Sequence, residues 1–294
     1  MKVFPFKIPK PENELVRHQV DHVSHFYDKL HQHPEVQLTI ILKGEGSLFV
    51  GDYIGRFVPG DIFLMGSNVP HVFRNDESYY EKKALKQAHS ESLFFDLDLM
   101  NLKLAGIEEF SGIADALRSL DGCYRFNGNQ HFVKSRILKL RNISGLKKVI
   151  LSMEILESIL EGNALMRLNS VGSVRYFSAR EGKRMESVMR FLMEQSHRHI
   201  SLSEAASVAN MNKEAFCRFF KERTRKTLTE FLNEVRVTKA CHLLGNNDLS
   251  IMQVAAESGF LNLSYFNRVF KNIKGTTPGE FRLNYLSEAK FSGR

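Results

Sequence analysis

The stretch that decides the fold of the C-terminal part is Ser250–Arg282, "SIMQVAAESGFLNLSYFNRVFKNIKGTTPGEFR". Ser250 with Gln253 three residues later has the pattern of a capping box, in which the two side chains satisfy N–H groups at a helix N-terminus. A short helix rich in small residues is expected next, and then a tight turn and a longer helix backed by phenylalanines. The stretch therefore predicts a helix-turn-helix unit.

A second copy of this pattern lies about fifty residues earlier. Ser201 and Glu204 form another capping box, and the segments 216–221 and 266–271 share the motif Phe-x-Arg-x-Phe-Lys. Between the copies, residues 227–244 predict one helix of about 27 Å, at 1.5 Å per residue. A rigid spacer of that length can set two helices about one DNA turn apart, near ~34 Å, on one face of a duplex.

Helical periodicity separates the inward and outward faces of the two longer helices. Residues three or four apart share a face, so the phenylalanines must lie in the core and the polar residues must face out. The candidate DNA-contacting residues are Asn212, Lys213, Glu214, Arg218, Lys221, Asn262, Ser264, Asn267, Arg268 and Lys271.

The roles of these residues leave alternatives open. Arg218 and Arg268 can read guanine in the major groove, contact phosphate or form surface ion pairs. Glu214 can accept from cytosine N4 or remain solvated. Asn212 and Asn262 can cap their helices or favour a phosphate there.

The charge distribution agrees with a nucleic-acid partner. The chain carries a net charge of +8, and residues 183–294 hold 18 Lys+Arg against 11 Asp+Glu. Nearly all of the positive excess therefore lies in the C-terminal 112 residues, as expected of a phosphate-binding module. A basic domain that binds no nucleic acid could carry the same net charge.

These residues carry a family resemblance. The last ~110 residues resemble the DNA-binding domain of AraC/XylS-type bacterial transcription regulators. The matching positions are Gly259-Phe260, Tyr265-Phe266, Arg268, Phe270-Lys271, Gly275, Pro278 and Phe281-Arg282. The resemblance implies that the outward residues contact double-stranded operator DNA, and that a β-type N-terminal domain senses an effector or dimerises.

The first unit departs from the family pattern at its exit. Arg225 stands where the family usually has the glycine that ends the reading helix, and Leu228 replaces a frequent proline. A non-glycine residue in the left-handed conformation costs about 1 kcal/mol. We therefore expect the exit of the first unit to differ from that of the second.

Residues from about 20 to 100 predict β-structure. Apolar residues alternate at Val36, Leu38 and Ile40, and glycines recur at turn-like intervals, with a clear turn at Pro59-Gly60-Asp61. Short strands with frequent glycine turns are typical of an antiparallel sandwich or barrel.

The resemblance extends to a cupin-like N-terminal domain through His31, His33, Gly44 and His71. It implies that His31, His33, Gln37 and His71 line an effector pocket. Gln37 stands where metal-binding cupins carry a glutamate, and alternate strand residues share a face, so Glu35 is expected to point into the same barrel.

The histidines leave a metal open as an alternative. Three neutral imidazoles, His31, His33 and His71, suit Zn, Fe, Ni or Cu, but no anionic ligand remains unless Glu35 replaces Gln37. We expect no cofactor and no catalysis. The alternatives are a metal-dependent cupin enzyme or a metal sensor fused to a DNA-binding domain.

Residues 107–162 change to helical periodicity. Helices are expected at 108–120, 134–143 and 145–162, the last with Ser144 as its N-cap. One face of the last helix is nearly heptad-like, so it predicts either packing within the domain or a homodimer contact. The candidate dimer residues are Leu146, Ile150, Met153 and Leu160.

The fold class that follows is α+β with two domains. A cupin-like β-barrel followed by helices is expected in 1–165, a linker in 166–182, and an all-α domain with two helix-turn-helix units in 183–294. No run is long enough to span a membrane, and the three widely spaced cysteines fit no disulfide framework. These features favour a cytoplasmic protein, and the family resemblance implies a bacterial, nucleoid-associated one.

Overall fold

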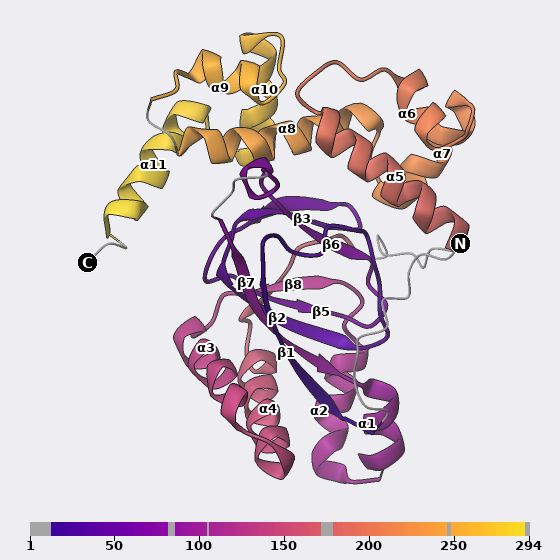
Figure 1. The fold of residues 1–294 in the computed structure, drawn as a ribbon, viewed down its shortest axis with the longest axis vertical. Coiled ribbons are helices and arrows are strands. Elements are labelled where there is room, and N and C mark those ends of the chain that lie inside the picture. Colours follow the sequence, from indigo (N-terminus) through magenta and orange to yellow (C-terminus); the bar gives the residue numbers. More distant parts are fainter. Residues whose placement is uncertain (1–12, 82–85, 105, 172–178, 246–247, 292–294) are drawn as a thin grey trace. The chain divides into compact units, whose positions relative to one another are not determined.

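The computed structural model describes residues 13–81, 86–104, 106–171, 179–245 and 248–291 (Figure 1). The chain divides into two compact units, Met1–Gly182 and Lys183–Arg294. The first unit combines strands with helices, and the described residues of the second are helical. The predicted α+β class is confirmed, with a β-rich N-terminal part and a helical C-terminal part. In the described ranges, none of the helices is long and apolar enough to cross a membrane.

Two antiparallel sheets form the β part of the first unit. The larger has the order β1-β7-β2-β5-β8-β9 and the smaller β4-β3-β6. The larger sheet contains β1 (Val16–Val23), β2 (Val36–Lys43), β5 (Ile62–Met65), β7 (Ala88–Phe95), β8 (Cys123–Phe126) and β9 (Leu165–Arg167). The smaller contains β3 (Gly46–Val50), β4 (Tyr53–Phe57) and β6 (His71–Asn75).

Alternation along the strands gives the larger sheet two different faces. On β2, Thr39 and Ile41 point to the interior between the sheets, whereas Leu38 and Ile40 are fully buried on the opposite face. An apolar cluster of the two sheets, including Phe57, fills part of the interior. The rest of the interior is a polar cavity.

Four helices cover the outer face of the larger sheet (Figure 1). They are α1 (Leu97–Leu104), α2 (Glu108–Arg118), α3 (Gln130–Lys139) and α4 (Gly145–Leu160), with single 3-10 turns at η1 (Glu77–Tyr79) and η2 (Leu140–Asn142). The helix expected at 134–143 begins earlier, because the side chain of Asn129 caps it by accepting from Phe132 N. Ser144 is the N-cap of α4, but its side chain makes no capping hydrogen bond.

Part of the range expected to be a linker, 166–182, belongs to folded elements. Leu165–Arg167 forms β9, which pairs with β8 and so covers that strand's open edge. The Asn169 side chain accepts a hydrogen bond from Cys123 N at 2.7 Å, and helix α5 begins at Ala179. Residues 172–178 lie outside the described residues.

The second unit contains two short-helix and long-helix pairs. Its helices are α5 (Ala179–Gln195), α6 (Leu202–Val208), α7 (Lys213–Thr224), α8 (Leu228–Leu244), α9 (Ile251–Glu257), α10 (Leu263–Lys274) and α11 (Pro278–Phe291). Both predicted capping boxes are present, at Ser201–Glu204 and Ser250–Gln253. A third, Thr227–Glu230, starts α8, the long helix between the pairs.

The end of α5 is fixed against α8 and the turn after α9. Arg236 of α8 donates to Ser196 O at 2.9 Å and to Arg198 O at 2.7 Å. A Cβ added to Gly259, which follows α9, would lie 2.2 Å from Ser196 O. The backbone approaches so closely there that only glycine fits.

The two long helices of the pairs end alike, contrary to the expectation from Arg225. Arg225 has φ 57° and Gly275 has φ 76°, and each donates its N–H to a lysine carbonyl four residues earlier. Thr224 holds the first exit, because its hydroxyl donates to Phe220 O at 2.8 Å. The capping box at Thr227 then starts α8 at once, so the local bonds outweigh the strain of the left-handed arginine.

Replacing Arg225 with glycine should therefore stabilise the chain. We expect Arg225→Gly to raise the free energy of unfolding by about 1 kcal/mol, since glycine adopts this conformation without the Cβ penalty. Urea denaturation of the full chain measures it. The matched variant Gly275→Arg should lose a similar amount, and a destabilised Arg225→Gly would contradict the assignment.

Candidate functional site

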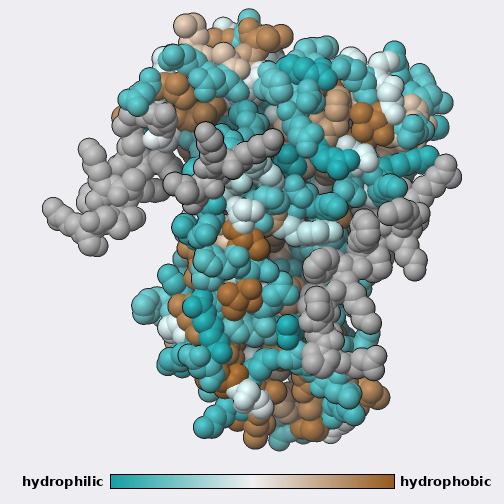
Figure 2. All heavy atoms as spheres, in the orientation of Figure 1, coloured by the Kyte–Doolittle hydropathy of each residue, from teal (hydrophilic) through white to brown (hydrophobic). Residues whose placement is uncertain are grey.

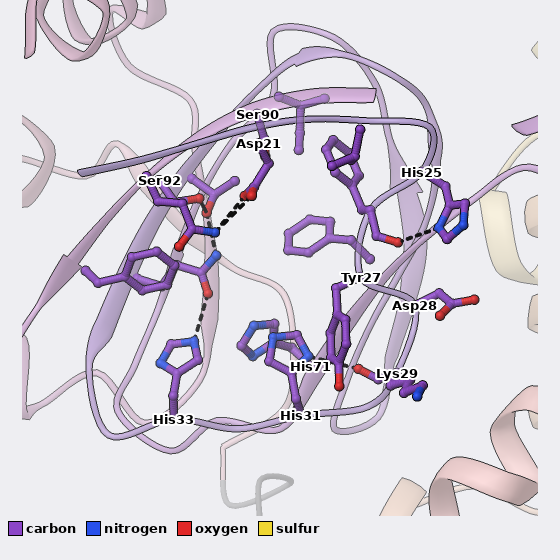
Figure 3. Close-up of a pocket in the computed structure, with 18 residues that line it drawn as sticks. Asp21, His25, Tyr27, Asp28, Lys29, His31, His33, His71, Ser90 and Ser92 are labelled. Atoms are coloured by element: carbon purple, nitrogen blue, oxygen red, sulfur yellow. Dashed lines mark hydrogen bonds between the residues drawn. The ribbon is translucent and has the colours of Figure 1, made fainter. Parts of the chain in front are cut away.

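A cavity of about 360 Å³ lies between the two sheets of the first unit (Figure 3). Strands β1, β2 and β7, the segment before β2, and the start of β6 supply its walls. His31, His33 and His71 gather at one end, and Ser90, Ser92 and Asp21 lie toward the other. The structure thus brings together the four residues predicted for the pocket, since Gln37 also lines it.

A backbone bridge joins the two histidine segments. His31 N donates to His71 O at 3.1 Å, and His71 N donates to His31 O at 2.9 Å. The ring centroids of these two residues lie 4.3 Å apart, and those of His33 and His71 lie 5.3 Å apart. One pair of main-chain hydrogen bonds therefore joins two residues that are forty positions apart in the sequence.

Each imidazole has its Nδ1 beside a main-chain carbonyl. The Nδ1 atoms lie 2.9 Å from Lys29 O, 3.1 Å from Glu35 O and 2.8 Å from Val69 O, for His31, His33 and His71 respectively. A neutral imidazole that donates from Nδ1 presents its Nε2 lone pair. The Nε2 of His71 is buried, and no described residue gives it a hydrogen bond.

Burial keeps these histidines neutral at pH 7. It lowers the pKa of His31 to about 4 and the pKa of His33 below its ordinary value. The pKa of His71 is well below its ordinary value, first because of burial and then because of the neighbouring imidazoles. The end of the cavity therefore offers uncharged nitrogen atoms.

A chain of hydrogen bonds runs from His33 across the cavity wall. His33 Nε2 lies 3.0 Å from Gln37 Oε1, Gln37 Nε2 donates to Thr39 Oγ1 at 2.6 Å, and the hydroxyls of Thr39 and Ser92 are 2.8 Å apart. Because a neutral imidazole has one N–H, His33 can donate to Glu35 O or to Gln37 Oε1, not to both.

Glu35 is the residue of this segment whose predicted position is wrong. It is buried, but it is not among the residues that line the cavity. Its carboxylate lies 3.7 Å from Nδ1 of His33, the nitrogen beside the main chain. The strand begins only at Val36, so the alternation that fixes the direction of Gln37 does not extend back to Glu35.

The three histidines fit a divalent transition metal. One nitrogen from each can be chosen so that all lie within 4.8 Å of one another. The Nδ1 contacts with carbonyls are the outer hydrogen bonds that orient metal-binding imidazoles. Gln37, however, supplies an uncharged oxygen, and it already contacts the His33 nitrogen that such an ion would use.

The long helices of the two pairs, α7 and α10, form the second candidate site. Their inward faces are buried phenylalanines, and the ten residues predicted to contact DNA are all exposed. Asn212 and Asn262 act as N-caps, with Oδ1 accepting from Ala215 N and Tyr265 N at 2.8 Å each. Arg268 also lies over the ring of Tyr265, 5.4 Å from its centroid.

Known families match both units. A helix-turn-helix domain of the AraC type matches residues 205–284, and a cupin domain matches residues 19–80. The chain is an AraC-type DNA-binding transcription regulator with a cupin domain. The predicted resemblance is thereby confirmed, and the two matches include α7 and α10 of the second unit and strands β2 to β6 of the first.

Similar proteins extend over most of this AraC-type regulator. An uncharacterised HTH-type transcriptional regulator of Haemophilus influenzae is 24% identical over 256 residues, 83% of this chain and 84% of that protein. The HTH-type transcriptional activator RhaR of Mannheimia succiniciproducens is 22% identical over 260 residues, 88% of each. Among solved structures, ToxT of Vibrio cholerae is 14% identical and aligns with 92% of this chain and 98% of its own, with a TM-score of 0.37.

Sequence reasoning missed one part of the regulator's cavity. Ser90 and Ser92 of β7 form its polar wall, and their alternation in "AHSESLFF" was the available signal. Asn75 holds the segment before β2 in place, because its Oδ1 accepts from Phe26 N at 2.7 Å and its Nδ2 donates to Glu45 O at 3.1 Å. The spacing of Asn75 belongs to the cupin resemblance, but no sequence pattern identifies these two contacts.

Proposed function

We propose that this regulator binds a small effector in the cavity of its cupin unit, and that the effector changes how α7 and α10 engage operator DNA. A ligand shifts such an equilibrium only through different affinities for the two states. The observation that carries the proposal is the cavity itself, which is about 360 Å³ in volume and has a polar wall facing neutral imidazoles.

The lining suits an uncharged or weakly polar ligand. Hydroxyl, amide and imidazole groups occupy one side, and aromatic side chains such as Phe26, Phe73 and Phe94 occupy others. Polar groups that fix the orientation of a ligand, beside aromatic surface that covers it, are a usual arrangement in small-molecule sites. An effector that exchanges hydrogen bonds with the Gln37–Thr39–Ser92 chain loses little on leaving water.

Binding without turnover is the proposed role of this cavity. Of the described residues that line it, Asp21 and Asp28 carry carboxylates. Both carboxylate oxygens of Asp21 already accept from Gln19, at 2.9 and 3.0 Å. Burial lowers the pKa of His31 to about 4 and the pKa of His33 and His71 below the ordinary value, so these three are poor general bases at neutral pH.

The operator contacts are proposed for the outward faces of α7 and α10. Arg218 and Arg268 are exposed one turn into their helices, where a guanidinium can reach a base edge or a phosphate. The α8 helix between the pairs spans about 26 Å, from its 17 residues at 1.5 Å per residue.

The effector site is tested by filling the cavity. Ser90→Phe places a ring in the lining, whereas the control Val20→Phe adds the same ring at a strand position that is 45% exposed. A panel of sugars, polyols, nucleosides and organic acids is screened by thermal shift. A compound that raises the Tm of wild type and the control and alters their operator affinity should do neither in Ser90→Phe. An equal response in all three proteins would place the effector elsewhere.

A divalent metal is a second candidate effector, favoured by one observation. The buried Nε2 of His71 has no hydrogen-bond partner among the described residues, and an unsatisfied buried acceptor costs about 1–3 kcal/mol. A bound ion would satisfy it, with His31 and His33 completing three ligands. The ion would supply a Lewis-acid point to which an effector oxygen can bind.

A cobalt titration of untagged, chelator-treated full chain tests this metal site. We expect Co²⁺ visible absorption to saturate near one ion per chain, and His71→Ala to abolish it. Gln37→Glu should tighten binding, because it adds an anionic oxygen donor beside the three imidazoles. Binding that survives in His71→Ala would contradict the site.

Dimerisation is proposed for the first half of α4 alone. Leu146 and Ile150 are 74% and 50% exposed, whereas Met153 and Leu160 pack against the unit's own core. The predicted stripe is therefore split, because the helix turns its second half toward the sheet. Exposed leucine and isoleucine on one helix face are apolar surface that a second copy would cover.

The variant Leu146→Glu with Ile150→Glu tests the dimer. It should convert dimer to monomer in sedimentation with little change in Tm, since neither side chain belongs to the core. Met153→Glu is the contrasting variant, and it should lower the Tm as well. A wild-type chain that sediments as a monomer, or a double variant that remains dimeric, would contradict this interface.

A further inference from the structure

The two long helices of the second unit are equivalent in position, residue for residue. Each has 12 residues, begins at an asparagine cap, and ends at a left-handed residue that donates to a lysine carbonyl. Their buried positions also match at an offset of fifty, with Phe216 and Phe220 opposite Phe266 and Phe270, and Phe219 opposite Val269. Any difference between their outward residues is therefore a difference in chemistry at the same place.

Two outward positions are the same in both helices. Arg218 corresponds to Arg268, and Lys221 corresponds to Lys271, and all four side chains are exposed. Identical cations at equivalent places give the two helices the same attraction for phosphate and the same preference for guanine. They cannot make one helix prefer a different sequence from the other.

The remaining outward positions differ in kind. Lys213, Glu214 and Cys217 of α7 correspond to Leu263, Ser264 and Asn267 of α10, and all are exposed. Within the described residues, no hydrogen bond or ion pair engages the side chains of Glu214 or Asn267. Their polar atoms are therefore available to a ligand.

From this contrast we propose that α7 reads a cytosine through Glu214 and α10 reads an adenine through Asn267, so that the chain binds a site with two unlike halves. The inference rests on the proposed role of these helices in operator contact. A carboxylate accepts from cytosine N4, and an asparagine amide pairs with N6 and N7 of adenine. A single chain then has a fixed direction on the duplex.

The apolar residues near α10 agree with an A·T-rich half. Leu261, just before the helix, is 88% exposed, and Leu263 at its first position is 40% exposed. Leucine has no donor or charge for a phosphate, but its methyl groups can pack on the C5-methyl of thymine. At the position of Leu263, α7 has Lys213, which favours a phosphate or guanine instead.

The Glu214 carboxylate should have opposite effects on the affinity for random DNA and on the affinity for the cognate site. A carboxylate near the duplex is repelled by every phosphate, so it weakens binding to random DNA. It strengthens binding only where a cytosine N4 donor meets it. Removing it should therefore tighten binding to random duplex and weaken binding to the cognate site. A glutamate that serves only the helix dipole would change both affinities in the same direction.

The experiment uses the full chain to select duplexes from a random pool. The affinity of each variant for the most enriched duplex is then measured. We expect two unlike half-sites, one with a required cytosine and one with a required adenine. Glu214→Ala should lose roughly 5- to 150-fold of the discrimination at the cytosine, and Asn267→Ala a similar factor at the adenine. Glu222→Ala, which removes another exposed acid of α7, is the control and should leave both preferences unchanged.

The outcomes separate this inference from the function on which it rests. Two identical selected halves, or base preferences that survive in Glu214→Ala and Asn267→Ala, would overturn the assignment of the bases. If no duplex is enriched, or if Arg268→Ala binds the selected duplex as wild type does, the proposed operator contact itself fails. The swap Glu214→Ser with Cys217→Asn should move the first half-site toward an adenine, which would support the assignment directly.

Discussion

Side chains on neighbouring strand positions point to opposite faces, and the cupin unit depends on this constraint. In β2 and β7, one set of positions packs under the helices and the other lines the cavity. The core set is fully apolar in β2, as Leu38 and Ile40 show. Because the core fixes the register of both strands, it also fixes where Gln37, Thr39 and Ser92 meet. The polar wall is thus positioned by hydrophobic packing on the other side of the same sheet.

The same constraint explains which parts of the cavity could be predicted. Gln37 lies inside a regular strand, so its direction followed from the alternation. Glu35 lies just before that strand, where the alternation does not apply, and its expected direction was wrong. The meeting of His31 with His71 depends on a main-chain bridge between distant segments. That pairing was expected from the cupin resemblance, since local periodicity contains no information about it.

In the helical unit, local signals were sufficient for most of the fold. Hydroxyl and amide side chains begin each helix from α6 to α11, and even α11 has Thr277 and Glu280 in a reciprocal pair. Capping is a contact between residues three apart, so the sequence alone reveals it. The expectation that α7 would end differently at Arg225 was wrong. The hydrogen bonds of Thr224 that hold this end depend on the path of the following loop, which the sequence does not reveal. The approach of Gly259 to Ser196 is likewise a long-range contact.

The close contact between Gly259 and Ser196 limits which changes the second unit can tolerate. Arg236 and Gly259 fix the second helix pair to the end of α5, and α8 joins it to the first pair. Inserting one residue in α8 would turn α10 by about 100° relative to α7 and shift it about 1.5 Å. Under the proposed operator contact, the outward faces of α7 and α10 would then no longer point to the same side of a duplex. If α7 and α10 contact DNA as proposed, exchanging their exposed side chains would change the bases that are read, whereas the distance between the two contacts would stay set by α8.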